Sequence, residues 1–189
     1  MGSSKSKQSL SAEDLAFLRT HTKFDEKTIK GWFKGFKQDC PDGKLTPTQF
    51  IDNYKKLFPK GTNADDFCSH IFRTFDKDKN GFVDFKEFLL TINVTSTGTA
   101  DEKLKWAFKM YDIDDDGVIV EDEMVKIVRA IYDVIEAGKM KPIDSPEERA
   151  RTIFKRMDTN NDCHVTEEEF VTGCLQDEEL KKMLAPTVQ

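Results

Sequence analysis

The sequence predicts an all-α protein of two lobes, each built from a pair of helix–loop–helix units whose loops meet in a short two-stranded β ladder. Three observations lead to this fold class. A twelve-residue loop pattern rich in carboxylates occurs four times, once in a degenerate form. Apolar residues at helical spacing precede the last three loops in the same register. A hydroxyl-rich stretch containing a glycine, residues 93–101, separates the second loop from the third and indicates a linker.

The N-terminal arm carries a lipidation pattern. Residues 1–6, MGSSKS, fit the acceptor pattern for N-myristoylation of Gly2 after removal of Met1. A chance match and an expression-tag remnant are the alternatives. Lys5 and Lys7 favour lipidation, because one myristoyl chain binds a membrane only marginally and needs a basic patch as a second signal.

Helices are predicted on both sides of each loop. Apolar residues recur at helical spacing from residue 11 to residue 36. In residues 68–75, 104–111 and 150–157 they stand at the same offsets before the loop that follows. Core packing explains most of the aromatic residues in these helices. Their density between residues 24 and 88 exceeds what a small core needs to close.

The first loop, residues 38–49, keeps the pattern in degenerate form. A glycine stands at its sixth position, but Gln38 and Cys40 occupy the first and third positions, where the later loops carry oxygen ligands. A proline follows Cys40 and stiffens the loop entrance. We therefore expect no cation in this loop. Its expected role is structural, with Leu45 paired to Val83 across the ladder.

The second loop, residues 76–87, is the best formed. Oxygen-bearing side chains stand at alternate positions, and a glycine at the sixth position makes the sharp turn. Ca²⁺ is a hard cation that takes roughly 6–8 oxygen ligands. The expected ligands are Asp76, Asp78, Asn80, the Phe82 carbonyl, Asp84 (directly or through water) and Glu87. A solvated acidic turn is the alternative interpretation, and recurrence of the pattern argues against it.

Two later loops repeat the pattern with one departure each. In residues 112–123 the expected ligands are Asp112, Asp114, Asp116, the Val118 carbonyl and Glu123. In residues 158–169 they are Asp158, Asn160, Asp162, the His164 carbonyl, Thr166 and Glu169. Val120 at the ninth position of the third loop offers no side-chain oxygen. Cys163 replaces the turn glycine of the fourth, and a left-handed conformation costs a non-glycine residue roughly 1–2 kcal/mol. We expect the fourth loop to bind most weakly.

Composition and motifs exclude several classes of function. The 189 residues carry a net charge of −6, yet the first 60 have five more basic than acidic residues, which suggests a surface-seeking N-terminal end. No apolar run approaches the ~18–20 residues of a membrane span. A dinucleotide fingerprint and a phosphate-binding loop are absent.

Cysteine and histidine usage points away from catalysis. Four widely spaced cysteines indicate reduced thiols in the cytosol. We expect no enzyme activity, because acidic residues outside the loops form no evident paired site and neither His21 nor His70 lies in a motif. We also expect no nucleic-acid partner.

Three stretches are characteristic as a group: MGSSKS at residues 1–6, the Cys40-Pro41 dipeptide in the first loop, and KLKWAFKMY at residues 103–111. Together they resemble the neuronal calcium sensor family of recoverin-, visinin- and frequenin-like proteins. TSTGTAD at residues 95–101 is most similar to the frequenin-like branch. The resemblance covers essentially the whole chain and implies an N-terminal myristoyl group, two lobes of paired EF-hands and a hydrophobic groove.

The family groove binds an amphipathic helix of a target protein, of the kinase, cyclase, channel or receptor class, at an anionic membrane surface. Carried over residue by residue, it involves Trp32, Phe36, Phe50, Tyr54, Phe58, Phe85 and Leu89. We expect a cytoplasmic calcium sensor that binds up to three Ca²⁺ and attaches peripherally to membranes through its myristoyl anchor. The expected domains are the arm with the first helix (1–23), the N-lobe (24–92), the linker (93–101), the C-lobe (102–175) and the tail (176–189).

Two other functions would use the same loops. A cytosolic calcium buffer needs neither acylation nor an aromatic groove. A calcineurin B-like regulatory subunit of a phosphatase is also acylated and four-handed, but we would expect its first loop to keep its ligands.

Overall fold

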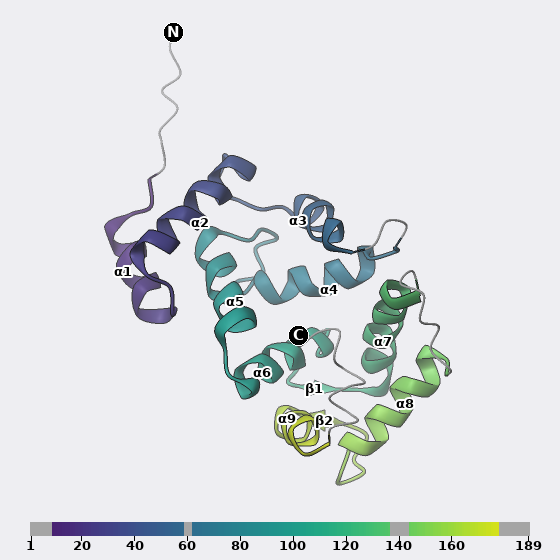
Figure 1. The fold of residues 1–189 in the computed structure, drawn as a ribbon. Coiled ribbons are helices and arrows are strands. Elements are labelled where there is room, and N and C mark those ends of the chain that lie inside the picture. Colours follow the sequence, from purple (N-terminus) through teal and green to yellow (C-terminus); the bar gives the residue numbers. More distant parts are fainter. Residues whose placement is uncertain (1–8, 59–61, 137–143, 178–189) are drawn as a thin grey trace.

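The computed structural model describes residues 9–58, 62–136 and 144–177, so Gly2 and the tail beyond residue 177 lie outside it. The described elements are α1 (Ala12–His21), α2 (Glu26–Asp39), α3 (Pro47–Tyr54), η1 (Lys55–Leu57), α4 (Asp65–Phe75), α5 (Phe85–Thr97), α6 (Ala100–Tyr111), β1 (Val118–Ile119), α7 (Glu121–Glu136), α8 (Pro146–Met157), β2 (Val165–Thr166) and α9 (Glu167–Gln176). The prediction of an all-α fold is confirmed (Figure 1). Within the described ranges, no helix is long and apolar enough to cross a membrane.

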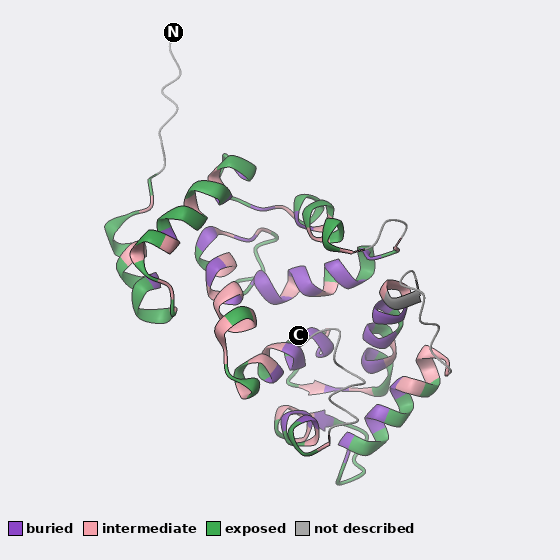
Figure 2. Cartoon of the chain, viewed as in Figure 1, coloured by how far each residue is buried: buried purple, intermediate pink, exposed green. Residues whose placement is uncertain are grey.

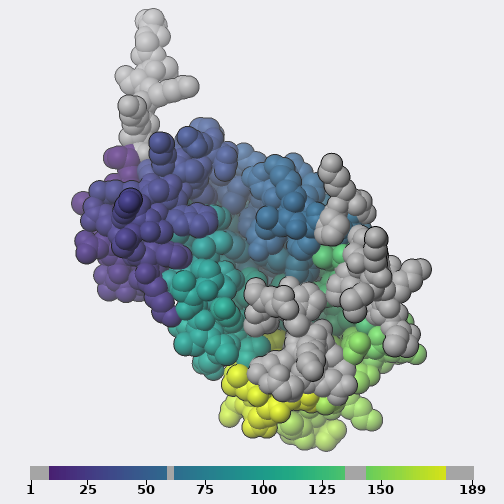
Figure 3. Space-filling model, viewed as in Figure 1, coloured from purple at the N-terminus to yellow at the C-terminus, as the bar shows by residue number. Residues whose placement is uncertain are grey.

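The helices form two halves that meet along α4. This helix packs against α3 and α5 of the first half and against α6 and α7 of the second. Buried residues are concentrated along α4 and α7 (Figure 2). In the space-filling view, α1 and α2 form one end of the molecule and α8 and α9 form the other (Figure 3).

Paired loops meet as predicted, with different extents of β structure. In the second half, β1 and β2 pair antiparallel, with Val118 opposite Thr166. In the first half the ladder is a single bridge, in which Leu45 and Val83 exchange two backbone hydrogen bonds of 2.9 Å. The predicted partner of Leu45 is confirmed. The short ladder expected there consists of this one bridge.

The ninth and twelfth positions of a loop also start the helix that follows it. In the second loop, Asp84 is the N-cap of α5 and Glu87 is its third residue, and the two form a capping box. Thr46 with Gln49 forms the same box at the start of α3. The degenerate first loop therefore keeps the residues that begin its exit helix, although it lacks the acidic ligands.

An aromatic cluster fills the first half. Phe36, Phe50, Phe75 and Phe85 are all buried. The rings of Phe50 and Phe75 lie 5.2 Å apart and those of Phe36 and Phe85 lie 5.6 Å apart, both edge to face. Such pairs contribute about 0.5–1.5 kcal/mol beyond their buried area. Core packing thus accounts for much of the high phenylalanine content.

The break between the halves is short. Only Gly98 and Thr99 separate α5 from α6, and the rest of the predicted linker is helical. A Cβ on Gly98 would lie 2.3 Å from the Val94 carbonyl oxygen, so the close approach of the backbone requires glycine. Thr99 caps α6 by accepting a hydrogen bond from the Glu102 N–H at 3.2 Å.

The burial of Leu89 generates a stability prediction. Leu89 is fully buried on α5, whereas Leu57 in the same half is 74% exposed. We expect Leu89→Ala to lower the free energy of unfolding by about 2–5 kcal/mol, measured by urea denaturation in excess chelator. The control Leu57→Ala should change it by less than about 0.5 kcal/mol. Equal effects of the two substitutions would contradict the placement of Leu89 in the core.

Candidate metal centres

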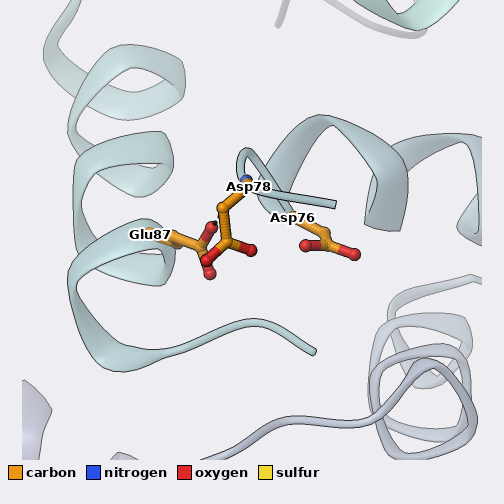
Figure 4. Close-up of side chains that lie close together, drawn as sticks. All are labelled: Asp76, Asp78 and Glu87. Carbon is orange, nitrogen blue, oxygen red and sulfur yellow. Dashed lines mark hydrogen bonds between the residues drawn. The ribbon is translucent and has the colours of Figure 1, made fainter. Parts of the chain in front are cut away.

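The second loop gathers acidic side chains around one point. Carboxylate oxygens of Asp76, Asp78 and Glu87 all lie within 4.8 Å of one another (Figure 4). Asp76 is buried at the end of α4, and its Oδ2 accepts a hydrogen bond from the Gly81 N–H at 2.9 Å. Gly81 has a φ of +86°, and a Cβ there would meet no atom within 4 Å, so backbone conformation and not space favours glycine. An all-oxygen acidic set of this kind fits a hard divalent cation.

Glu87 joins the two ends of this loop. Its Oε1 accepts hydrogen bonds from the N–H groups of Lys77 at 2.9 Å and Asp78 at 3.3 Å. Its Oε2 accepts one from the Asp84 N–H at 3.0 Å. Asp84 in turn accepts from the Glu87 N–H at 2.9 Å. One carboxylate therefore holds both the loop entrance and the start of α5.

A second hydrogen bond recurs in all three complete loops. The side-chain oxygen at the fifth position accepts a hydrogen bond from the N–H at the seventh position. This bond connects two expected ligand residues, because the seventh residue is expected to bind through its carbonyl. The pairs are Asn80 with Phe82 at 2.9 Å, Asp116 with Val118 at 3.0 Å, and Asp162 with His164 at 2.9 Å.

The third loop repeats the acidic cluster. Carboxylate oxygens of Asp112, Asp114 and Asp116 lie within 4.8 Å of one another. Glu123 Oε2 accepts from the Val120 N–H at 3.0 Å, so the ninth-position backbone is held although its side chain has no oxygen. Burial raises the pKa of Asp112 and the charge of Glu123 raises it further, against backbone hydrogen bonds that lower it. A bound cation would reverse that shift, since it favours the charged carboxylate.

The fourth loop has the same backbone with weaker acidic convergence. The Cys163 N–H donates to Asp158 Oδ2 at 3.1 Å, and Cys163 has a φ of +66°, the strained conformation expected at the glycine position. Burial raises the pKa of Glu169, but hydrogen bonds from Thr166 and Thr159 outweigh this and hold that pKa below its ordinary value. Among the described residues, groups of three close carboxylates occur in the second and third loops and not in this one.

The first loop is closed by backbone and amide groups. Gln38 belongs to α2, and Cys40 is buried at the end of that helix. Gly43 has a φ of +77°, and its N–H donates to the Cys40 carbonyl at 2.9 Å. Gln49 Oε1 accepts from the Thr46 N–H at 3.0 Å. These bonds support the turn without a cation, and the first and third positions offer no carboxylate.

An apolar groove of about 650 Å³ lies between α2, α3 and α5. Four of the seven predicted groove residues line it: Trp32, Phe36, Phe50 and Tyr54. Trp32 is 41% exposed, which is unusual for so large an apolar side chain. The groove lies against α5, the exit helix of the second loop.

The structure places the other three predicted residues elsewhere. Phe85 and Leu89 are buried in the core, because they occupy the inward face of α5. Phe58 packs edge to face on Phe67, with ring centres 5.9 Å apart. Phe88 and Ile92, which the sequence analysis did not assign to the groove, line it instead. Residues four apart share one face of a helix, so Phe85 and Leu89 mark one face of α5 and Phe88 and Ile92 mark another. This pairing is the signal in the sequence that could have distinguished the two faces.

Comparisons with known proteins find EF-hand family models in both halves of the chain and relatives over nearly its full length. Two family models match, each described as an EF-hand domain pair, over residues 41–90 and residues 101–175. Neuronal calcium sensor 1 from Lymnaea stagnalis is 45% identical over 94% of this chain and 92% of the relative. Recoverin from Homo sapiens is 40% identical over 97% of this chain and 93% of the relative. S-modulin from Aquarana catesbeiana is 35% identical over 97% of this chain and 92% of the relative. The chain therefore belongs to the neuronal calcium sensor family of EF-hand proteins.

Proposed function

We propose that this protein is a calcium sensor that binds Ca²⁺ in its second, third and fourth EF-hands and regulates target proteins through the groove between α2, α3 and α5. One observation carries the proposal. In each complete loop, a glutamate at the twelfth position accepts backbone hydrogen bonds from both ends of the loop; these residues are Glu87, Glu123 and Glu169. The first hand, with Gln38 and Cys40 in ligand positions, is proposed to bind none.

Calcium binding would act on the groove through the exit helix. Sensor EF-hands bind in about the 10⁻⁷–10⁻⁵ M range, and binding changes the angle between the entering and exiting helices. In the second hand the twelfth-position Glu87 lies in the first turn of α5, and Phe88 and Ile92 on that helix line the groove. A change in the hydrogen bonds that Glu87 accepts would therefore move α5, which forms one wall of the groove. Three Ca²⁺ would also bring the net charge from −6 to zero.

The relatives do not favour the two alternative functions. One matched relative is named neuronal calcium sensor 1, and the groove exposes Trp32, whereas a calcium buffer needs no exposed aromatic groove. A calcineurin B-like subunit is expected to keep its first-loop ligands, unlike Gln38 and Cys40 here. We propose that the chain has no catalytic activity of its own.

The ligand assignment predicts a calorimetric pattern. Wild-type protein should bind three Ca²⁺, and Glu87→Gln and Glu123→Gln should each remove one binding event, because a neutral amide cannot supply a bidentate carboxylate. Gln49→Glu restores the final acid of the first loop but not its first or third ligand, so the count should stay at three. A fourth ion bound by Gln49→Glu or by wild-type protein would contradict the assignment of the first hand.

The groove is proposed to receive an amphipathic helix of a target protein, of the kinase, cyclase, channel or receptor class. A synthetic amphipathic helix of Leu, Ala, Glu and Lys serves as the probe, titrated by calorimetry with calcium. Trp32→Ala should weaken binding by about 2 kcal/mol, roughly 30-fold, because large aromatic side chains at apolar pockets dominate binding energies. Phe17 is a matched control: it is 40% exposed on α1, beyond the groove. Equal losses for Trp32→Ala and Phe17→Ala would contradict the assignment of the groove.

We also propose N-myristoylation of Gly2 and peripheral attachment of a cytoplasmic protein to anionic membranes. Gly2 lies outside the described residues, and the support is the acceptor pattern with its nearby lysines. Acylated wild-type protein should sediment with phosphatidylserine-containing liposomes, and Gly2→Ala should remain in the supernatant. Sedimentation that is independent of calcium and survives Gly2→Ala would contradict the lipid anchor.

A further inference from the structure

Arg73 connects the second hand to the third. It lies on α4, the entering helix of the second hand, and its guanidinium donates three hydrogen bonds across to the other half. Nη1 donates to the carbonyls of Asp112 at 2.6 Å and Ile113 at 2.9 Å, and Nη2 donates to the carbonyl of Met110 at 2.7 Å. These carbonyls belong to the C-terminal end of α6 and to the start of the third loop. Helix C-terminal carbonyls lack partners within their own helix, so a cation there is favourable.

Two neighbouring contacts join the same segments. The Trp106 indole N–H on α6 donates to Thr74 Oγ1 at 3.0 Å, and Thr74 is buried. The fourth-position residues of the two loops form an ion pair, with Lys79 Nζ 2.7 Å from Asp115 Oδ2. One continuous contact therefore runs from the end of α4 to the loop beyond α6.

Of these contacts, Arg73 contributes most. The side chains of Lys79 and Asp115 are 63% and 52% exposed, and exposed ion pairs contribute little to stability. Arg73 is half-buried, and its three charge-assisted bonds are of the stronger kind. Burial lowers the pKa of Arg73, and the negative charges of the third-loop carboxylates oppose that shift, so they offset part of the cost of burying the guanidinium.

We propose that Arg73 is a positioning residue for calcium binding in the third hand, and that calcium in the second hand raises the affinity of the third through it. This inference rests on the proposed function of both hands. Asp76, the first expected ligand of the second loop, is three residues after Arg73 and ends the same helix. Calcium in the second loop fixes that helix end, and the guanidinium then holds the backbone that presents the Asp112 carboxylate. Because linkage is reciprocal, calcium in the third hand raises the affinity of the second by the same factor.

Two backbone amides report the loops separately. The Gly81 N–H donates to Asp76 Oδ2 at 2.9 Å, and the Gly117 N–H donates to Asp112 Oδ2 at 3.0 Å. The Gly117 amide signal of the full-length ¹⁵N-labelled chain is followed in chelator-buffered calcium, with and without Glu87→Gln. The ratio of the two midpoint calcium concentrations is the linkage factor. We expect a factor of at least about 5, within the usual range for coupled sites.

Arg73→Lys and Arg73→Gln test the residue itself. Lysine keeps the positive charge and glutamine keeps an amide donor, but neither presents the planar fork that reaches three carbonyls. Both variants should reduce the linkage factor to below about 2, the loss of most of the coupling free energy. The control Arg19→Lys, an exposed arginine on α1 that pairs with Glu26 at 3.4 Å, should keep the wild-type factor.

A merely structural role for Arg73 would shift the Gly117 midpoint equally with and without Glu87→Gln and would leave the factor unchanged. That result, or a factor near one in wild-type protein, would overturn the linkage alone. If the Gly81 and Gly117 amide signals of wild-type protein did not change with calcium concentration, the proposed function would be wrong. The linkage, which rests on that function, would then be wrong as well.

Discussion

The hydrogen bonds of the twelfth-position side chain are the constraint on which each hand depends. In all four hands this side chain accepts from the N–H at the ninth position and so starts the exit helix; the residues are Gln49, Glu87, Glu123 and Glu169. In the three complete hands, the glutamate also accepts from the N–H at the second position. A loop can therefore lack acidic ligands and still start its exit helix. The first hand, with Gln38 and Cys40 at two ligand positions, is of this kind, and it pairs with the second hand through Leu45 and Val83.

In the second hand the same constraint connects the proposed metal site to the apolar groove. A calcium ion must compete with backbone amides for the glutamate oxygens, and those amides lie at both ends of the loop. On the proposed function, calcium that takes the glutamate oxygens from these amides changes the angle between the exit helix and the entering helix. In the second hand the exit helix is α5, which buries Leu89 on one face and offers Phe88 to the groove on the other. Ion binding and groove shape thus depend on one helix.

The loops could be predicted from the sequence because their information is local. Ligand spacing, the turn glycine and the capping pair all lie within twelve residues, and the structure brings Asp76, Asp78 and Glu87 together as that spacing requires. The groove residues came from the family resemblance, and the rotation of α5 depends on tertiary packing. In the structure Phe85 and Leu89 are buried, and Phe88 and Ile92 line the apolar groove. The contact of Arg73 with the Asp112 carbonyl spans 39 residues, and no local pattern marks it.

The central claim is that three hands with a complete loop bind calcium and the hand without one does not. Native mass spectrometry of the full chain at rising free calcium counts the bound ions directly. We predict that the chain takes up three Ca²⁺ and then saturates. A fourth specifically bound ion would contradict the structural role of the first hand, and saturation at two or fewer would contradict the assignment of the complete loops.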